Sequence, residues 1–245
     1  MRRLCATLML ALGCTPELEP IRWQPIDIDA LRQAIENPTG FVDEASANEV
    51  AAAIVQRNEP YRVLAEYLHG VFMGAESGEV GPPWLVPQAL AGTSVYVMVA
   101  CPGPLDDFAE PFAHGSMRID SPTLDAEVIS TFAVRGQLRL SFTACEIDEY
   151  VFEGTARAFH DSDPHELGLT PELDVAWLAQ PDQPYTLREP VLLDAAGRVS
   201  ALFELSSGET LALDWYVTQV ELHLRGRNGE LLCTIVDSSL DCVPP

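Results

Sequence analysis

Apolar and polar residues alternate over two neighbouring runs in the middle of the chain, between residues 131 and 160. The apolar positions of the two runs are Leu138, Leu140, Phe142 and Ala144, then Tyr150, Phe152, Gly154, Ala156 and Ala158. Because successive side chains of a strand point to opposite faces, each run predicts a strand with one buried and one solvated face. The acidic segment 146–149 separates the runs and predicts the turn of a β-hairpin.

Residues 27–74 have helical spacing instead. Apolar residues three and four positions apart predict helices over 27–36 and from about residue 60 to 74. The second of these carries the stripe Tyr61, Leu64, Leu68, Val71 and Phe72. Ser46 and Glu49 have the spacing of a capping box, which predicts a further helix to about residue 57. The stripe predicts packing on a sheet, with a docking face for a partner as the alternative.

Strand patterns return from residue 94. Residues 94–100 are apolar on both faces and predict a central strand, and 115–120 predict a short one. Residues 128–134 are expected to pair with 137–145 across the turn Arg135-Gly136.

A five-strand meander is expected to close the chain over residues 187–236. Its last turn is predicted at Asn228-Gly229, a dipeptide that favours hairpins. Residues 160–184 have one apolar island at 175–179 and predict irregular structure.

These patterns together predict a single α+β domain over residues 26–245. Its helical part spans 27–74 and its β-rich part 94–236, with the N-terminal helices packed on a curved antiparallel sheet. The alternative is an all-β sandwich or barrel with the helices as a cap.

The charge of the chain restricts its partners. There are 37 acidic residues against 14 basic ones, all arginine, and the net charge is −23. Such a balance excludes nucleic acid, whose phosphates require a positive surface, and argues against adsorption on an anionic membrane. Solubility explains the charge, and cation binding is the alternative.

The N-terminus predicts export. Met1-Arg2-Arg3 is positive, residues 4–13 are apolar, and Cys14 follows directly. About ten apolar residues are too few to cross a hydrocarbon core of about 30 Å as a helix. A positive start followed by a short apolar run is typical of a secretory signal peptide.

Ala11-Leu12-Gly13-Cys14 resembles the lipobox of bacterial lipoproteins, although Ala and Leu stand in the reverse of the preferred order. The resemblance implies that residues 1–13 are a cleaved signal peptide and that Cys14 carries acyl chains. Residues 14–25 would then be a tether, and the protein would face the periplasm or the cell surface. The alternation of apolar and polar residues in the body of the chain is similar to that of β-rich lipoproteins of unassigned role. Plain secretion is the alternative.

Cysteine parity fits lipidation. Cys5 leaves with the signal peptide, and acylation of Cys14 leaves an even set of four. Of the three possible pairings we expect disulfides Cys101–Cys145 and Cys233–Cys242, because the second pair is close in sequence and the first two cysteines follow strands.

The densest group of possible metal ligands is His160, Asp161, Asp163 and His165. Imidazoles and carboxylates at this spacing can hold a divalent ion, and a solvated acidic loop is the alternative. We find neither a G-x-S-x-G nucleophile motif nor a Gly-rich phosphate loop, and we expect no cofactor.

The sequence therefore predicts a lipid-anchored, exported envelope protein with a non-catalytic structural or interaction role. A carrier that binds an apolar ligand between sheet and helices is the first alternative. A metal-dependent enzyme acting through His160 and His165 is the second.

Overall fold

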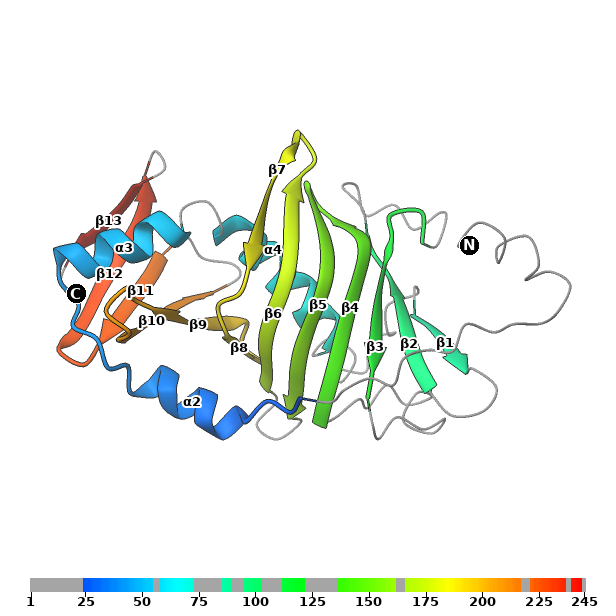
Figure 1. The fold of residues 1–245 in the computed structure, drawn as a ribbon, viewed down its shortest axis with the longest axis horizontal. Coiled ribbons are helices and arrows are strands. Elements are labelled where there is room, and N and C mark those ends of the chain that lie inside the picture. Colours follow the sequence, from blue (N-terminus) through cyan, green and yellow to red (C-terminus); the bar gives the residue numbers. More distant parts are fainter. Residues whose placement is uncertain are drawn as a thin grey trace, which may run out of the picture.

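The computed structural model describes residues 24–54, 58–72, 85–89, 95–102, 112–121, 136–161, 166–216, 221–236 and 239–243. Within these residues, thirteen strands form one antiparallel sheet, and three helices pack on it (Figure 1). The helices are α2 (Ile28–Glu36), α3 (Glu44–Ile54) and α4 (Asn58–Phe72). None of these helices is both long enough and apolar enough to span a bilayer.

The sheet is a meander in which almost every strand pairs with its neighbour in sequence. The strands are β1 (Leu85–Ala89), β2 (Val95–Ala100), β3 (Ser116–Asp120), β4 (Gly136–Ile147), β5 (Tyr150–Asp161), β6 (Glu166–Trp177), β7 (Gln180–Leu187), β8 (Val191–Asp194), β9 (Arg198–Glu204), β10 (Thr210–Tyr216), β11 (Glu221–Gly226), β12 (Gly229–Val236) and β13 (Ser239–Val243). One edge of β6 pairs with β5, and different parts of its other edge pair with β7 and with β8.

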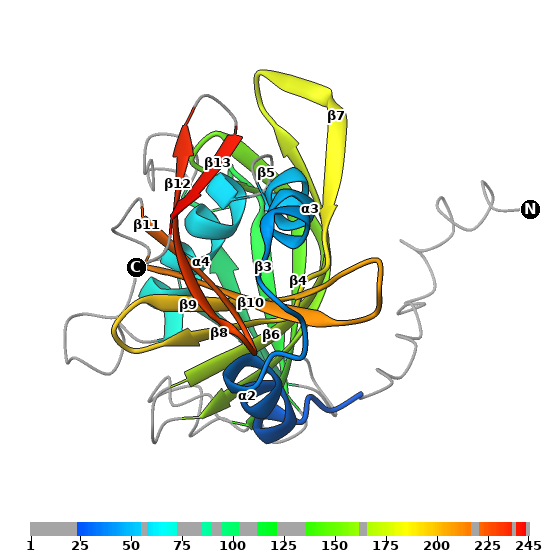
Figure 2. The same cartoon turned by 90° about the vertical axis from the view of Figure 1, so that its left-hand side faces the viewer.

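The two faces of the sheet are covered by different helices around β8–β10. Figure 2 shows these strands between α2 on one side and α3 and α4 on the other. Ile28, Leu31 and Ile35 of α2 pack with Leu192 and Ala212, apart from the main core. The adjacent positions of the same strands belong to the main core with α3 and α4. Burial on both faces explains why β8 and β10 are apolar without alternation.

The apolar stripe of α4 packs on the sheet, as its spacing predicted. All five stripe residues are buried, and they join the main core with strands β2–β12. At the start of the helix the Tyr61 hydroxyl donates to a Glu189 carboxylate oxygen at 2.7 Å. The Tyr61 ring meets the indole of Trp215 edge-on, with the ring centroids 6.3 Å apart. The stripe is therefore a packing surface in this fold.

A short connection carries the chain from α2 to α3 across the ends of β10–β12. Gly40 N–H donates to the Thr210 carbonyl at 2.8 Å, and the Asn228 side chain bonds both backbone groups of Val42. A Cβ at Gly226 would lie 2.6 Å from the Gly40 carbonyl oxygen, so only glycine allows this close approach. These contacts tie the helical N-terminal region to the C-terminal strands.

The cap of α3 differs from the expected one. Asp43 and Ser46 form the reciprocal pair: Ser46 N–H donates to Asp43 Oδ1 at 2.8 Å, and Asp43 N–H donates to Ser46 Oγ at 2.9 Å. The hydrogen bond from the Ser46 backbone lowers the pKa of the Asp43 carboxyl below its ordinary value. Glu49 instead accepts from the backbone N–H of Ser206 at 2.5 Å. The helix therefore begins two residues before Ser46.

The hairpin of β4 and β5 is confirmed, with one correction. The register shifts between Phe142 and Cys145, and this bulge places Ala144 on the exposed side with φ 44°. Cys145 takes the buried position that strict alternation had assigned to Ala144. A bulge adds one residue to a strand and so reverses the faces beyond it.

The predicted α+β class is wrong. Among the described residues, thirteen strands stand against three short helices, which is an all-β fold with a few helices. Residues 160–184, expected to be irregular, contribute β6 and most of β7. β6 places Leu167, Leu169, Pro171, Leu173 and Val175 inward, although a proline within a run is rare in a central strand. The pairing of β6 with β8 ends before Pro171, and its pairing with β7 begins after it, so the proline interrupts no ladder on that side.

Other expectations are settled only in part. β2, β3 and the C-terminal meander are confirmed, and β13 extends the meander beyond residue 236. The last hairpin turns at Arg227-Asn228, because Gly226 pairs with Gly229, one position earlier than predicted. Residues 128–134 lie outside the described part of the chain.

Candidate functional site

The structure forms both expected disulfides. Cys101, just after β2, is bonded to Cys145 at the β4 bulge across 44 positions in sequence, and both are buried. Cys233 and Cys242 are directly opposite each other on β12 and β13, with Cα atoms 4.1 Å apart. Disulfides persist in oxidising compartments and are rare in the cytosol, so the two bridges accord with an exported protein.

Several predicted site residues lie outside the described part of the chain. These are the signal peptide, the acylation site Cys14, and the candidate metal ligands Asp163 and His165. His160 and Asp161 are described at the end of β5. His160 is 3% exposed, and its ring packs on Phe72 of α4 with the centroids 5.3 Å apart. No group of three possible ligands among the described residues is arranged to hold a metal ion.

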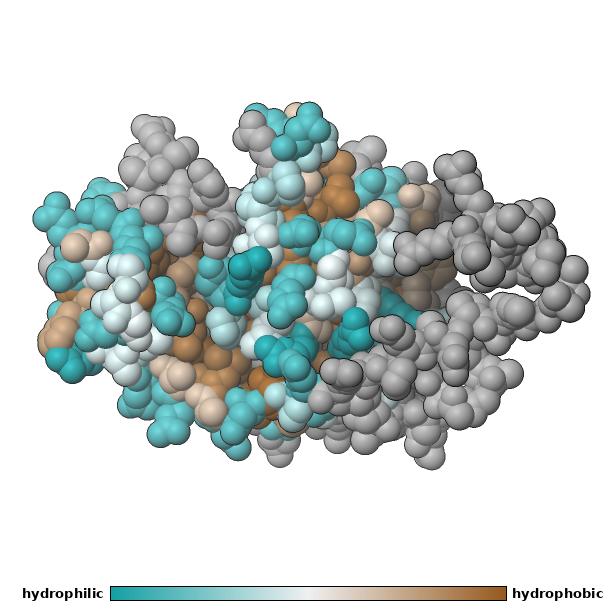
Figure 3. Space-filling view, viewed as in Figure 1, coloured by the Kyte–Doolittle hydropathy of each residue, from teal (hydrophilic) through white to brown (hydrophobic). Residues whose placement is uncertain are grey.

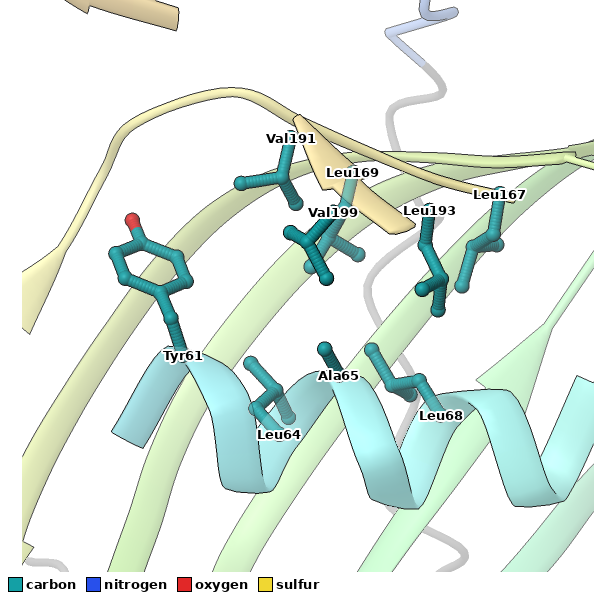
Figure 4. Close-up of a pocket in the computed structure, with 9 residues that line it drawn as sticks. All are labelled: Tyr61, Leu64, Ala65, Leu68, Leu167, Leu169, Val191, Leu193 and Val199. Carbon is teal, nitrogen blue, oxygen red and sulfur yellow. The ribbon is translucent and has the colours of Figure 1, made fainter. Parts of the chain in front are cut away.

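An apolar cavity lies between α4 and the sheet. Figure 4 shows Leu64, Ala65 and Leu68 pointing from α4 toward apolar side chains of β6, β8 and β9. The space left between them is about 10 Å³, which is about the size of one water-sized sphere. An apolar ligand would need several hundred Å³. This cavity therefore gives the apolar-carrier alternative no support.

A larger, polar space lies on the opposite face of the sheet. Residues of α2, β6 and β8–β12 line a groove of about 420 Å³, called the charged groove below. It is bordered by the apolar contact of α2 with the sheet, and Figure 3 shows apolar residues gathered beside α2 over β8 and β9. Three arginines, one histidine and four carboxylates face it: Arg32, Arg198, Arg225, His223, Glu36, Glu166, Asp214 and Glu230.

Strand register places a polar row across the floor of this groove. Ser200 of β9 pairs with Asp214 of β10, and Asp214 pairs with His223 of β11. Ser200 is 3% exposed and Asp214 is 8% exposed. Side chains at directly paired positions stand on the same face of a sheet, so the row forms one continuous polar strip.

The row contains the residue types of a catalytic triad in the wrong order. A triad needs the imidazole between serine and carboxylate, within hydrogen-bond reach of both. Here Asp214 stands between, and two strand spacings of about 4.8 Å separate Ser200 from His223. The His223 Nδ1 atom is instead paired with Glu230 of β12. The floor of the groove is therefore built for hydrogen bonding and lacks the geometry of acyl transfer.

Ion pairs hold the charged walls in place. Arg225 Nε lies 2.5 Å from Asp214 Oδ2, and an Arg32 guanidinium nitrogen lies 2.6 Å from Glu166 Oε2. The bond to Glu166 raises the pKa of Arg32 above its ordinary value, so this guanidinium stays charged. These pairs lie partly shielded from water, where they fix side-chain orientation better than exposed pairs do.

One buried polar atom of the groove residues has no partner in the described part of the chain. Asp214 Oδ1 is buried and accepts no hydrogen bond. Ser200 and Tyr216 also line the groove, and each contributes a hydroxyl group. A buried acceptor without a donor costs about 1–3 kcal/mol, so such an atom marks a place where a donor is expected.

Trp215, Trp177 and His69 are not part of the lining of the charged groove. Trp215 is in the core, and Trp177 is exposed and donates from its indole to Glu149 at 3.1 Å. Nε2 of His69 lies 3.0 Å from the Ala195 carbonyl oxygen. Trp84 lies outside the described residues.

No local sequence signal identified the charged groove, because its residues come from seven elements between positions 32 and 230. One weak sign was present: Asp214 interrupts the otherwise apolar run from Leu211 to Trp215. A carboxylate in a strand buried on both faces requires a specific partner or ligand.

Comparison with known proteins does not assign the site. The chain matches no protein-family model, no curated protein and no solved structure. The case for a function therefore depends on the geometry alone.

Proposed function

We propose that the chain is an exported, lipid-anchored protein of the cell envelope that binds a ligand in the charged groove and has no catalytic role. The signal peptide and the lipobox-like segment ending at Cys14 support the export and the anchor. The two disulfides support an oxidising compartment.

The observation that carries the binding role is the floor of the charged groove. Asp214, one of whose carboxylate oxygens is buried without a partner among the described residues, and its neighbour Ser200 line a space of about 420 Å³. This volume lies within the range of roughly 300–1,000 Å³ typical of small-molecule sites. Ion pairs keep the walls in one arrangement, and such preorganisation reduces the entropy lost on binding.

A thermal-unfolding comparison tests the binding role without knowledge of the ligand. The low-molecular-weight fraction of a bacterial envelope extract is expected to raise the Tm of the chain, because a ligand of the folded state stabilises it. Glu36→Trp, at the exposed end of α2, should fill the groove mouth and abolish the increase. Glu66→Trp, on the exposed side of α4, is the matched control and should retain it. An increase of equal size in both variants, or none in the unmodified chain, would refute a ligand site in the groove.

A further inference from the structure

We infer that the ligand of the charged groove is a neutral, hydroxyl-rich molecule, namely a carbohydrate unit of one or two sugar rings. This inference rests on the proposed function and specifies the chemistry of the same site.

The first argument is that all three arginines and three of the four carboxylates of the groove are already paired with described residues, the exception being Glu36 at the exposed end of α2. Arg225 is bonded to Asp214, Arg32 to Glu166 and His223 to Glu230. Arg198 is bonded to Asp194 at 3.2 Å. A charged ligand would have to replace one member of such a pair and leave the other without its counter-charge, which is costly in a partly buried site. On the floor of the groove, away from Glu36, the pairing therefore disfavours both anions and cations.

The second argument is the kind of hydrogen-bonding group that the groove residues contribute. Asp214 Oδ1 can only accept, whereas the hydroxyls of Ser200 and Tyr216 can donate and accept. A ligand hydroxyl offers one donor and two acceptor positions, so neighbouring hydroxyls on a sugar ring can satisfy the aspartate and a protein hydroxyl together. The hydrogen bond to the carboxylate would be charge-assisted and stronger than a neutral one.

The third argument is the apolar part of the lining. Ile35 of α2 and Leu192 of β8 also face the groove, and both belong to the apolar contact between that helix and the sheet. A sugar ring presents C–H groups on its faces and hydroxyls around its rim. A site with an apolar wall next to a polar strip matches that division, because few precisely placed polar groups on apolar surroundings define orientation.

The long-range field points the same way. The chain carries a net charge of −23, which repels anions from every approach. Cations are attracted by the whole molecule, and the lining has four carboxylates against three arginines, so only the pairing of these groups disfavours cations. A neutral ligand is not repelled by the net charge and breaks no ion pair.

The test is calorimetric titration of the full chain, purified in a detergent without a sugar headgroup. The probes are glucose, N-acetylglucosamine and their β-linked disaccharides, with inorganic phosphate and spermidine as charged counterparts. At least one neutral sugar is expected to bind saturably, and the two charged probes are not. Removal of one hydrogen bond costs about 1 kcal/mol, so Ser200→Ala and Tyr216→Phe should each weaken binding roughly fivefold. The double variant should lose about 25-fold if the effects add.

Ser141→Ala is the matched control, because Ser141 is a half-buried serine of β4 away from the groove. It should bind like the unmodified chain. The inference fails if no neutral sugar binds, if a charged probe binds instead, or if both groove variants bind normally. If the envelope extract still raises the Tm in a Glu36-dependent manner, only the carbohydrate assignment fails and the binding role stands.

Discussion

Replacing Cys101 and Cys145 together with alanine is expected to lower the free energy of unfolding by about 4 kcal/mol. The bridge closes a loop across 44 positions in sequence, and the entropy that a crosslink removes from the unfolded chain grows with the logarithm of loop length. The same relation gives about 2.7 kcal/mol for Cys233–Cys242, which spans nine positions. Equilibrium urea unfolding, followed by the fluorescence of buried Trp215, measures both losses.

The two double variants control for each other. Each removes two sulfur atoms from the same sheet, so the difference between them reports loop length. A reductant opens both bridges, so it should bring the unmodified chain below either double variant, to about the stability of a variant lacking all four of these cysteines, and should leave that variant unchanged. A greater loss for the short bridge than for the long one would contradict the topology described for β2, β4, β12 and β13.

Leu68→Ala is expected to lower the free energy of unfolding by about 3 kcal/mol. Leu68 is buried in the stripe of α4 and faces Leu167, Leu193 and Val199 of the sheet. Truncation of a buried leucine costs its transfer energy plus a contribution from the void it leaves, in total about 2–5 kcal/mol. The void would adjoin the cavity of about 10 Å³ that already exists there, so the packing defect should be large.

Glu66→Ala on the same helix is the control. Glu66 is exposed and pairs with Arg62 at 3.3 Å, a type of surface ion pair that contributes less than about 1 kcal/mol. The two substitutions therefore separate burial from helix propensity. A loss of less than about 1 kcal/mol for Leu68→Ala would mean that α4 is not docked on the sheet.

The elements with regular periodicity were predictable from the sequence. The stripe of α4, the alternation of β4 and β5 and the cysteine pairing depend on local spacing or parity, and the structure agrees with them. The fold class was not predictable by the same means. The segment of β6, which includes Pro171, was expected to be irregular, and one bulge exchanged the exposed and buried positions of Ala144 and Cys145. Both features are decided by pairing partners far away in sequence.

The charged groove shows the same limit more strongly. Ser200 and His223 are unremarkable in their own segments, Asp214 only interrupts an apolar run, and the three form a polar row only when three strands take their register. Long-range pairing creates the site, so periodicity within one element cannot reveal it. The metal hypothesis stays a prediction: His160 lies buried against Phe72, and Asp163 and His165 lie outside the described residues.

The most direct test of the proposed exported, lipid-anchored protein is the intact mass of the chain extracted from bacterial membranes, measured with and without reduction. The expected mass is that of a chain beginning at Cys14 with acyl chains attached, and reduction should add the mass of four hydrogens. A chain that retains Met1, carries no acyl mass and gains nothing on reduction would contradict it.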